Sequence, residues 1–450
     1  MAAVVLLSLL SGAAAQAIAP SITANIRPDI PSMPVHTVEG YQIPALKEIT
    51  KDAPSSKTVA MYSTGLPGAT PTISGAPVIP TAPSYLNYPE LDKIPATNSP
   101  QVQKWMSEIN WALVPNLTVT DGTCAGSPAA ANDPSRCWWT CGGCTRKTDI
   151  AECPDQYTWG ISFDDGPSPY TPLLLDYLEE KNIKSTFFLV GSRVISYPSM
   201  VVTEYLAGHQ LSIHTWSHPS LTKLSNEEIV AELGWTKQAI HDVVGVTPNT
   251  FRPPYGDIDD RVRGIAAQMG LTPVMWTRHN GKTLDTTDWN IPGGQASGET
   301  AVSRFQDILD TVPQLDTGFI VLQHDLYQQT VDLAVGYFLP MAVASGKYAM
   351  KSIIECLGLP NSEGYIETSA NVTATQIPGS GTVFQPKVGT QTGVAPEITT
   401  GKSANGAAAT DSKSGSPAGA SVTPKSGATK SYASAAIALA AVLATIAFSA

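Results

Sequence analysis

The chain has 450 residues, a formal net charge of -11 and only 14% charged residues. This acidic balance, with no Lys/Arg-rich patch, argues against nucleic acid as a partner. Proline and glycine, with 36 residues each, concentrate toward the two ends of the chain. That distribution predicts one globular centre with long, poorly ordered flanks.

The N-terminal residues 1–17 are typical of a secretory signal peptide. An apolar run reaches from Met1 to Leu10, and small residues follow it with an Ala-x-Ala-like cleavage point near Ala17. A buried helix is the alternative interpretation. Residues 18–100 carry many prolines and show little periodicity, so we interpret them as an extended arm or a propeptide.

Six cysteines behind a signal peptide predict disulfide bonds, because secreted proteins meet an oxidising environment. Cys153 and Cys356 flank the globular centre, so we expect them to pair and to staple its ends. The other four lie in a Trp-containing stretch, residues 101–154, which we expect to form a disulfide-stapled collar: Cys124, Cys137, Cys141 and Cys144. A four-cysteine zinc site is the alternative for this cluster. Sequons at Asn116 and Asn371 fit a secreted, glycosylated surface.

The C-terminal part predicts a stalk and a lipid-anchor signal. Residues 373–430 are rich in Ser, Thr, Gly, Ala and Pro, a composition typical of a disordered linker. Residues 431–450 form an uncharged apolar tail, and small residues precede it at Ser426. This is the layout of a GPI attachment signal, with Ser426 as the expected site and small residues near Gly419 as the alternative. A true membrane span is the other interpretation, although so short and Ala-rich a tail is marginal for one.

Strands and helices alternate between residues 155 and 358, which predicts an α/β domain with a parallel sheet and covering helices. The expected strands are 157–163, 185–190, 210–213, 250–252, 272–276 and 318–323. The expected helices are 170–181, 192–208 with a kink at Pro198, 225–244 with a capping box at its start, 259–269, 300–312 and 331–344. In such folds the active site lies at the carboxyl ends of the strands.

Polar side chains follow several of these strands at the point where each strand ends. They are Asp164 and Asp165, then His214 and His218, then Arg252, then His324. Because the carboxyl ends of parallel strands meet at one edge, a single catalytic ring assembled from successive strand ends explains this spacing. Each of these residues taken alone is more often structural, and only their joint placement favours catalysis.

His214 and His218 lie four residues apart, so on one helical turn both imidazoles would face the same side and could chelate a metal. With one carboxylate of the aspartate pair they form a two-histidine, one-carboxylate site with open positions. This donor set favours zinc, and iron or cobalt would fit the same ligands. The remaining aspartate would be the general base for the water that the metal activates. Spacing alone leaves open which of Asp164 and Asp165 takes which role.

Further residues fit supporting roles. Arg252 is a natural partner to keep the base carboxylate ionised and oriented. His324 is the candidate general acid for the leaving atom; it needs a raised pKa, and Asp288 is the available carboxylate to raise it. A backbone N–H near Tyr255 could stabilise an oxyanion together with the metal. These roles together predict metal-assisted hydrolysis of an acyl group.

Five ordered segments resemble the motifs of the NodB-type polysaccharide deacetylases, the family-four carbohydrate esterases, and are most similar to those of GPI-anchored fungal chitin deacetylases. The segments are Ser162–Pro167, His214–Pro219, Arg252–Gly256, Asp285–Trp289 and Ile320–Asp325. The resemblance covers about residues 155–358. Ser162 replaces the family's usual threonine, a mild change that should not affect the chemistry.

The resemblance implies a distorted (β/α) barrel with an open groove. It implies Asp164 as the base and Asp165 as a metal ligand with His214 and His218, so it settles the assignment that spacing leaves open. It further implies that Arg252 orients the base, that Asp288 tunes the acid His324, that Leu322 lines the acetyl-methyl pocket and that Trp289 helps to wall the groove. The implied cofactor is a divalent metal, Zn²⁺ or Co²⁺.

The resulting hypothesis is a secreted, GPI-anchored, metal-dependent chitin deacetylase of the cell membrane and cell wall, which releases acetate and leaves chitosan. Its expected partners are the chitin polymer and, through the anchor, the membrane; no nucleic acid or protein partner is implied. One alternative is an esterase of the same fold that acts on O-acetylated xylan. Another is a catalytically silent carbohydrate-binding or wall-structural protein, which the intact catalytic set argues against.

Overall fold

The computed structural model describes residues 37–38, 41–53, 71–81 and 84–370. The predicted signal peptide 1–17, linker 373–430, tail 431–450, sequon Asn371 and anchor residue Ser426 lie outside the described residues. Within the described ranges, no helix is long and apolar enough to cross a membrane.

A parallel sheet of five described strands carries the site. Its order follows the chain: β4 (Ser162–Asp164), β5 (Thr186–Leu189), β6 (Gln210–Ile213), β7 (Thr250–Phe251) and β8 (Thr272–Pro273). The register places Asp164 opposite Phe188 and Ile213 opposite Phe251, so the strand ends lie at one level. The residues after these strands therefore come together at one edge, as the sequence predicts.

The sheet closes into the distorted barrel that the resemblance implies. On the far side of β4, Asp164 pairs in parallel with His324, and Leu322 pairs in parallel with Asp285. The backbone of Thr277, which continues from β8, donates a hydrogen bond to the carbonyl of Ile320 at 3.0 Å. The ring of backbone contacts thus runs from β4 through β8 and back to β4.

A three-stranded sheet continues from one side of the barrel. It contains β11 (Phe319–Ile320), β3 (Thr158–Gly160) and β12 (Ala349–Lys351), all parallel. The prediction of one strand over 157–163 is wrong in this respect: the extended chain changes neighbours at Ile161, pairing with β12 before it and with β5 after it. The strands predicted over 272–276 and 318–323 are likewise shorter than expected. Two small antiparallel pairs, β1 (Thr37–Val38) with β2 (Tyr41–Gln42) and β9 (Arg278–His279) with β10 (Lys282–Thr283), complete the described strands.

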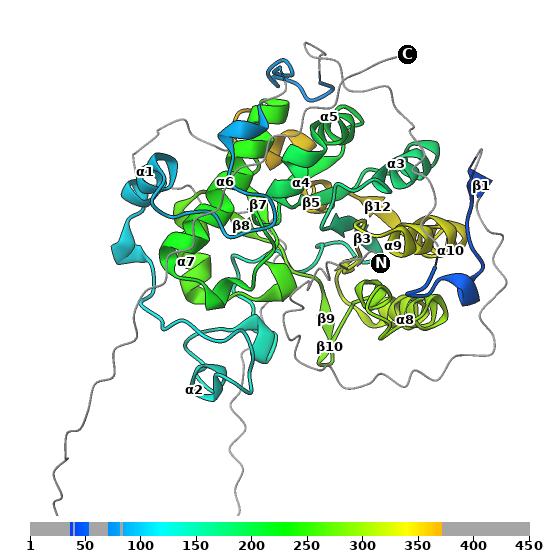
Figure 1. Cartoon of the computed structure of the whole chain (residues 1–450). Coiled ribbons are helices and arrows are strands. Elements are labelled where there is room, and N and C mark those ends of the chain that lie inside the picture. The colour runs from blue at the N-terminus through cyan, green and yellow to red at the C-terminus, as the bar shows by residue number, and fades with distance from the viewer. Residues whose placement is uncertain (1–36, 39–40, 54–70, 82–83, 371–450) are drawn as a thin grey trace, which may run out of the picture. The chain divides into compact units, whose positions relative to one another are not determined.

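Helices surround the strands (Figure 1) and follow the predicted alternation. The long helix α6 begins at the capping box of Ser225 and Glu228, as predicted, and ends at Gly245 in the left-handed conformation that favours glycine. The helices are α1 (Pro100–Glu108), α2 (Pro128–Ala131), α3 (Thr171–Glu180), α4 (Gly191–Ser196), α5 (Pro198–Leu206), α6 (Asn226–Val244), α7 (Asp260–Gln268), α8 (Gly298–Thr311), α9 (Gln328–Leu333), α10 (Leu339–Ser345) and α11 (Ile353–Cys356), with a π-helical turn Ala334–Phe338 between α9 and α10.

The start of α11 closes the amino-terminal end of the barrel. The N–H of Ile353 donates to the hydroxyl of Thr186 at 2.8 Å, and the N–H of Ile354 donates to the side-chain oxygen of Gln210 at 2.9 Å. Thr186 and Gln210 stand at the beginnings of β5 and β6. The barrel therefore has a polar, hydrogen-bonded floor, and the carboxyl ends of the strands remain for the site.

The described parts of the arm pack on this domain. Ile43 and Ile49 are buried, and the hydroxyl of Tyr41 donates to Asp332 at 2.8 Å. The carbonyl of Ile49 accepts the N–H of Gly298, at the start of α8, at 2.9 Å. These contacts attach the arm to the domain and place Ile43 and Ile49 in its core.

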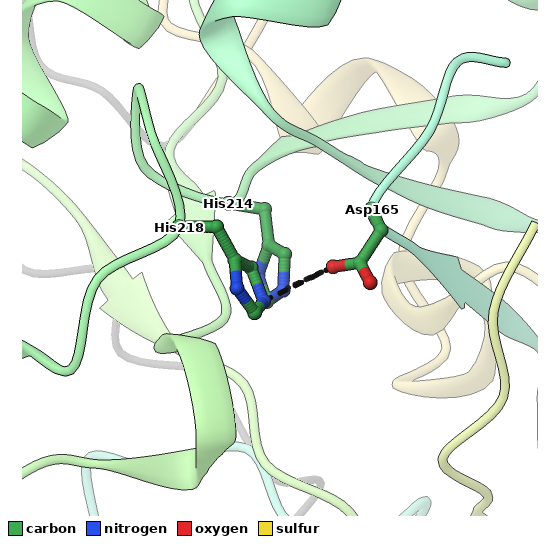
Figure 2. Close-up of side chains that lie close together, drawn as sticks. All are labelled: Asp165, His214 and His218. Atoms are coloured by element: carbon green, nitrogen blue, oxygen red, sulfur yellow. Dashed lines mark ion pairs between the residues drawn. The ribbon is translucent and has the colours of Figure 1, made fainter. Parts of the chain in front are cut away.

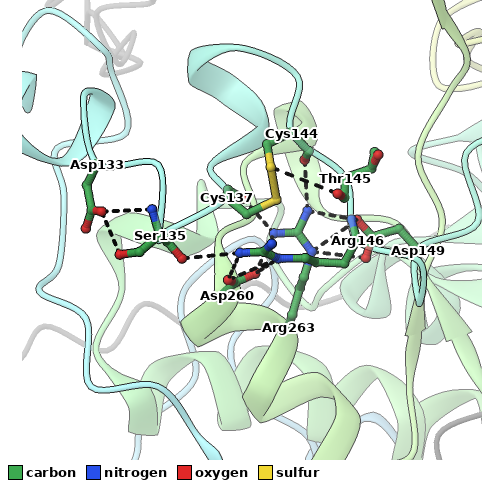
Figure 3. The surroundings of a disulfide bond; sticks show 9 residues. All are labelled: Asp133, Ser135, Cys137, Cys144, Thr145, Arg146, Asp149, Asp260 and Arg263. Carbon is green, nitrogen blue, oxygen red and sulfur yellow. Dashed lines mark hydrogen bonds and ion pairs between the residues drawn. A yellow bond between two sulfur atoms is a disulfide. The ribbon is translucent and has the colours of Figure 1, made fainter. Parts of the chain in front are cut away.

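The collar docks on α7 through buried and half-buried charges. Arg136 of the collar pairs with Asp259 at 2.8 Å with both side chains buried. Arg263 of α7 reaches back to Asp149 at 2.8 Å and donates to the carbonyls of Cys137 and Cys144 beside their disulfide (Figure 3). Since α7 follows Arg252–Gly256 closely, the collar supports the segment that carries part of the site.

All six cysteines lie in the described part of the chain, and all form disulfides. Cys153 pairs with Cys356, which confirms the predicted staple; Cys124 pairs with Cys141, and Cys137 pairs with Cys144. The alternative of a four-cysteine zinc site is therefore wrong, because sulfur in a disulfide is no thiolate ligand.

We expect removal of the Cys153–Cys356 disulfide to lower the free energy of unfolding more than removal of a short-range disulfide. Cys153 and Cys356 are 203 residues apart, and loop closure in the unfolded chain predicts a loss of about 5 kcal/mol for the double change to alanine. Urea unfolding measures this free energy. The matched control is the pair Cys124→Ala and Cys141→Ala, whose separation of 17 residues predicts a smaller loss. Equal losses in the two variants would contradict the expectation.

Candidate active site

Three left-handed backbone positions shape the loops that bring the predicted metal ligands together. Asp165 follows β4 with φ 75°, and Thr215 and His218 follow β6 with φ 65° and 61°. The expectation that His214 and His218 share one helical turn is wrong, because the segment between them is an irregular loop. Such backbone conformations are unfavourable for residues other than glycine, so contacts with neighbouring residues must hold these loops in place.

The loops direct three side chains toward one point (Figure 2). Nε2 of His214 lies 3.3 Å from Oδ1 of Asp165, and Nε2 of His218 lies 3.1 Å from the same oxygen. His214 is buried, whereas His218 and Asp165 are partly exposed. Burial acts to raise the pKa of Asp165, whereas His218 and His214, when protonated, act to lower it well below its usual range.

This donor set fits a divalent metal. The carbonyl of Arg252 can only accept, so Nδ1 of His214, at 2.7 Å from it, carries the hydrogen. A neutral imidazole then presents the Nε2 lone pair to Asp165, whose buried Oδ1 has no hydrogen-bond partner. Lone pairs that face each other at about 3 Å repel unless a cation lies between them. The structure therefore has a possible metal site at Asp165, His214 and His218.

Asp164, next to this site, has a different partner. Its Oδ1 accepts a hydrogen bond from Arg252 at 2.6 Å, and both side chains are buried. The guanidinium lies 4.0 Å from the ring centroid of Phe188 and also donates to the hydroxyl of Ser162 at 2.9 Å. A buried arginine held in this way fixes the position of the carboxylate and stabilises its charge.

His324 and Asp288 form the second buried pair. Oδ1 of Asp288 lies 2.8 Å from Nδ1 of His324, and its Oδ2 accepts the backbone N–H of the same histidine at 2.9 Å. Burial alone would lower the pKa of His324, but Asp288 and the more distant carboxylates of Asp165 and Asp164 raise it to about 10. The Nδ1 contact leaves Nε2 as the nitrogen with a proton to donate.

The three residues expected at the substrate differ in exposure. Tyr255 is 56% exposed, with φ 59°, and its ring centroid lies 4.7 Å from that of His218. Leu322 is buried, and its backbone pairs with Asp285. Trp289 is half-buried and follows Asp288, whose Oδ1 accepts its N–H at 2.8 Å. Tyr255 therefore stands beside the possible metal ligands, and Trp289 beside the buried pair.

Sequence reasoning assigned no role to two residues that lie against the site. Glu232, on α6, binds the backbone between the two histidines, and the motif spacing carries no signal for it. Asp325 is buried next to His324, where its carboxylate accepts the hydroxyl of Thr171. Burial, with Asp165 and Asp164 nearby, raises the pKa of Asp325 to about 7 against that hydrogen bond. Its position directly after His324 could have marked it.

We expect Asp288→Asn to lower the pKa of His324 well below about 10, because burial remains and the largest opposing charge is gone. Proton NMR titration of the metal-free protein measures it, with the His324 signal assigned by its loss in His324→Gln. An unchanged pKa in the variant would contradict the assigned pair.

The same pair makes stability depend on pH. Since folding raises the pKa of His324 from 6.5 to about 10, its contribution is fully present below pH 6.5 and is lost as the pH rises through about 10. We expect the wild-type metal-free protein to lose more stability than Asp288→Asn between these pH values in urea unfolding.

Comparisons with known proteins identify the family of the chain. Residues 151–274 match the family model described as polysaccharide deacetylase. The chain is 61% identical over 378 residues to Chitin deacetylase 1 of Cryptococcus neoformans var. grubii, covering 81% of this chain and 80% of that protein. It is 34% identical over 352 residues to Chitin deacetylase 2 of the same organism, with 72% and 74% covered. The solved chitin deacetylase from Colletotrichum lindemuthianum is 27% identical, with 50% of this chain and 97% of that chain covered and a TM-score of 0.44. The predicted resemblance is confirmed, and the chain belongs to the polysaccharide deacetylase family of hydrolases.

Proposed function

We propose that this protein removes acetyl groups from N-acetylglucosamine units of chitin, giving chitosan and acetate at the cell surface and wall. The observation that carries the proposal is the meeting of three units at one end of the barrel: the Asp165–His214–His218 cluster, the Asp164–Arg252 pair and the Asp288–His324 pair. The similarity to chitin deacetylases supports the choice of substrate.

Asp165, His214 and His218 would hold the metal. Three protein ligands leave positions open for water and substrate, which distinguishes a catalytic site from a closed structural one. Zn²⁺ is the first choice for two imidazoles and a carboxylate, and Co²⁺ fits the same donors. When bound, the metal supplies Lewis acidity for the amide carbonyl and for water.

Asp164 is the general base. It adjoins Asp165 in the chain, so it stands beside the place where water would enter. Its carboxylate accepts the proton that the attacking water loses, and Arg252 holds the carboxylate in one orientation at 2.6 Å. The second buried donor from Arg252, to Ser162, keeps the guanidinium from turning away.

His324 is the general acid. Asp288 keeps it protonated at neutral pH and fixes its ring through two contacts, at 2.8 and 2.9 Å. Its Nε2 then donates a proton to the amine nitrogen as the bond between nitrogen and the acetyl carbon breaks. The base and the acid are neighbours, because Asp164 and His324 form a parallel β-bridge between adjacent segments of the barrel.

Side chains around this centre would receive the sugar. We assign Leu322 to the acetyl methyl group because it is buried and apolar beside His324. Tyr255 is exposed enough to stack on a sugar ring, and its backbone N–H is the proposed oxyanion donor. Trp289 contributes a wall on the side of Asp288.

Acetate release from defined substrates tests the proposed reaction. We expect the zinc-loaded protein to release acetate from N-acetylglucosamine oligomers and to lose this activity after chelation. Acetylated xylan is the control substrate, on which the proposed amide hydrolase should be weak. Faster release from acetylated xylan would instead support the esterase alternative, and no release from either polymer would contradict both.

We expect Asp164→Asn to lower the rate of acetate release by about 10²–10⁴-fold, the usual contribution of a positioned general base, while the metal content stays at the wild-type level. Arg252 then loses a buried partner, so the melting temperature should also fall. The exposed Asp316→Asn is the matched control. Loss of metal from Asp164→Asn would show that the roles of the two aspartates are exchanged.

Anchoring at the membrane through Ser426 is the proposed localisation, and it rests on the apolar tail alone. We expect deletion of residues 433–450 to release active enzyme into the medium, measured by acetate release in culture supernatant and in washed membranes. Retention of the truncated enzyme on membranes would contradict the anchor.

A further inference from the structure

A carboxylate outside the reaction centre holds the loop between the two histidines. Glu232 lies in the middle of α6 and is fully buried. Its Oε2 accepts the backbone N–H of Trp216 at 2.7 Å and that of Ser217 at 2.9 Å, and its Oε1 accepts the hydroxyl of Ser217 at 2.6 Å. One side chain thus binds three donors from two consecutive loop residues.

The loop needs this support because its backbone is strained on both sides of these residues. Thr215 and His218 both have positive φ, which costs of order 1–3 kcal/mol for each residue outside glycine. The hydroxyl of Thr215 accepts the N–H of His218 at 3.0 Å and closes a tight turn. Two consecutive N–H groups inside the turn point the same way, and a single carboxylate oxygen of Glu232 accepts both of them.

Packing fixes the other side of the same loop. The Trp216 ring is fully buried, stacks on Tyr88 with 6.1 Å between centroids, and donates its indole N–H to the carbonyl of Glu90 at 3.0 Å. Gly191 leaves the space that this ring fills, since a Cβ there would lie 2.6 Å from it. The loop is therefore held on one side by the hydrogen bonds to Glu232 and on the other by the contacts of Trp216 with Tyr88 and Glu90 of the arm.

We propose that Glu232 is a positioning residue for metal binding, which presets the loop so that His214 and His218 face Asp165 before the metal arrives. The inference rests on the proposed function, because it takes these three residues as the ligands. A preset loop removes the ordering cost from the binding step and so strengthens metal affinity.

The test is the metal affinity of Glu232→Gln, with Glu227→Gln as the matched control. Glu227 lies on the same helix and is exposed, so its change removes the same charge without touching the loop. A glutamine keeps the shape, but its NH₂ cannot accept, so at least one loop donor loses its partner. We expect Zn²⁺ affinity, measured by chelator competition, to fall about 10–100-fold in Glu232→Gln and to stay at the wild-type value in the control.

Two further readouts separate positioning from general stability. The absorption spectrum of the Co²⁺-loaded protein should change in Glu232→Gln, and acetate release should recover toward the wild-type rate when Zn²⁺ is saturating. A merely structural residue would lower the melting temperature and leave the affinity unchanged, and that result would overturn the inference.

Ser217→Ala keeps the test decisive if Glu232→Gln does not fold. It removes only the hydroxyl donor at 2.6 Å, and we expect a smaller loss of Zn²⁺ affinity, about 3–10-fold, from one lost hydrogen bond. Unchanged affinity in this variant would also overturn the inference. His218→Ala is the reference for the site itself: if it binds Zn²⁺ as tightly as the wild type, the proposed ligand set fails, whatever the effect of Glu232.

Discussion

Two neighbouring carboxylates at the end of one buried strand cannot both be charged unless each has its own cationic partner. Asp164 has Arg252 at 2.6 Å, and Asp165 faces two imidazoles that fit a metal. The two carboxylates have separate partners in the structure, because Arg252 contacts Asp164 and the two imidazoles contact Asp165. The strand order β4-β5-β6-β7 brings these partners to the same edge of the sheet, because His214 follows β6 and Arg252 follows β7.

The site residues could be predicted from the sequence because their signal is local: each is a polar residue that stands where an apolar strand ends. The outcome for Cys153 and Cys356 follows from the same kind of argument, since residues that flank one domain meet when its ends meet. The conformation of the loop between His214 and His218 could not be predicted from the sequence. Four-residue spacing suggests a helical turn for His214 and His218, whereas the structure uses positive φ and the distant Glu232 to bring them together. A contact between a loop and the middle of a later helix leaves no periodic trace.

The arm shows a second limit of periodicity. Isolated apolar residues such as Ile49 and aromatic ones such as Tyr88 carry no repeating pattern, yet Ile49 is buried under α8 and Tyr88 stacks on the ring of Trp216. A segment that packs without regular structure depends on the surface that it meets, and that surface is visible only after the domain has folded. Its contact with Trp216 links the arm to the loop that carries the possible metal ligands.

The proposed acid and the proposed base each have a buried partner of opposite charge. Burial acts to lower the pKa of His324, and Asp288 beside it opposes that effect. Arg252 beside Asp164 forms the second such pair, and each partner is itself buried. Asp164 and His324, one member of each pair, form a parallel bridge, so the buried charges lie close together and are little screened by solvent. Each pair thus couples a group of the proposed reaction to a partner that does not itself react, so a change at Asp288 or Arg252 acts on the site through His324 or Asp164.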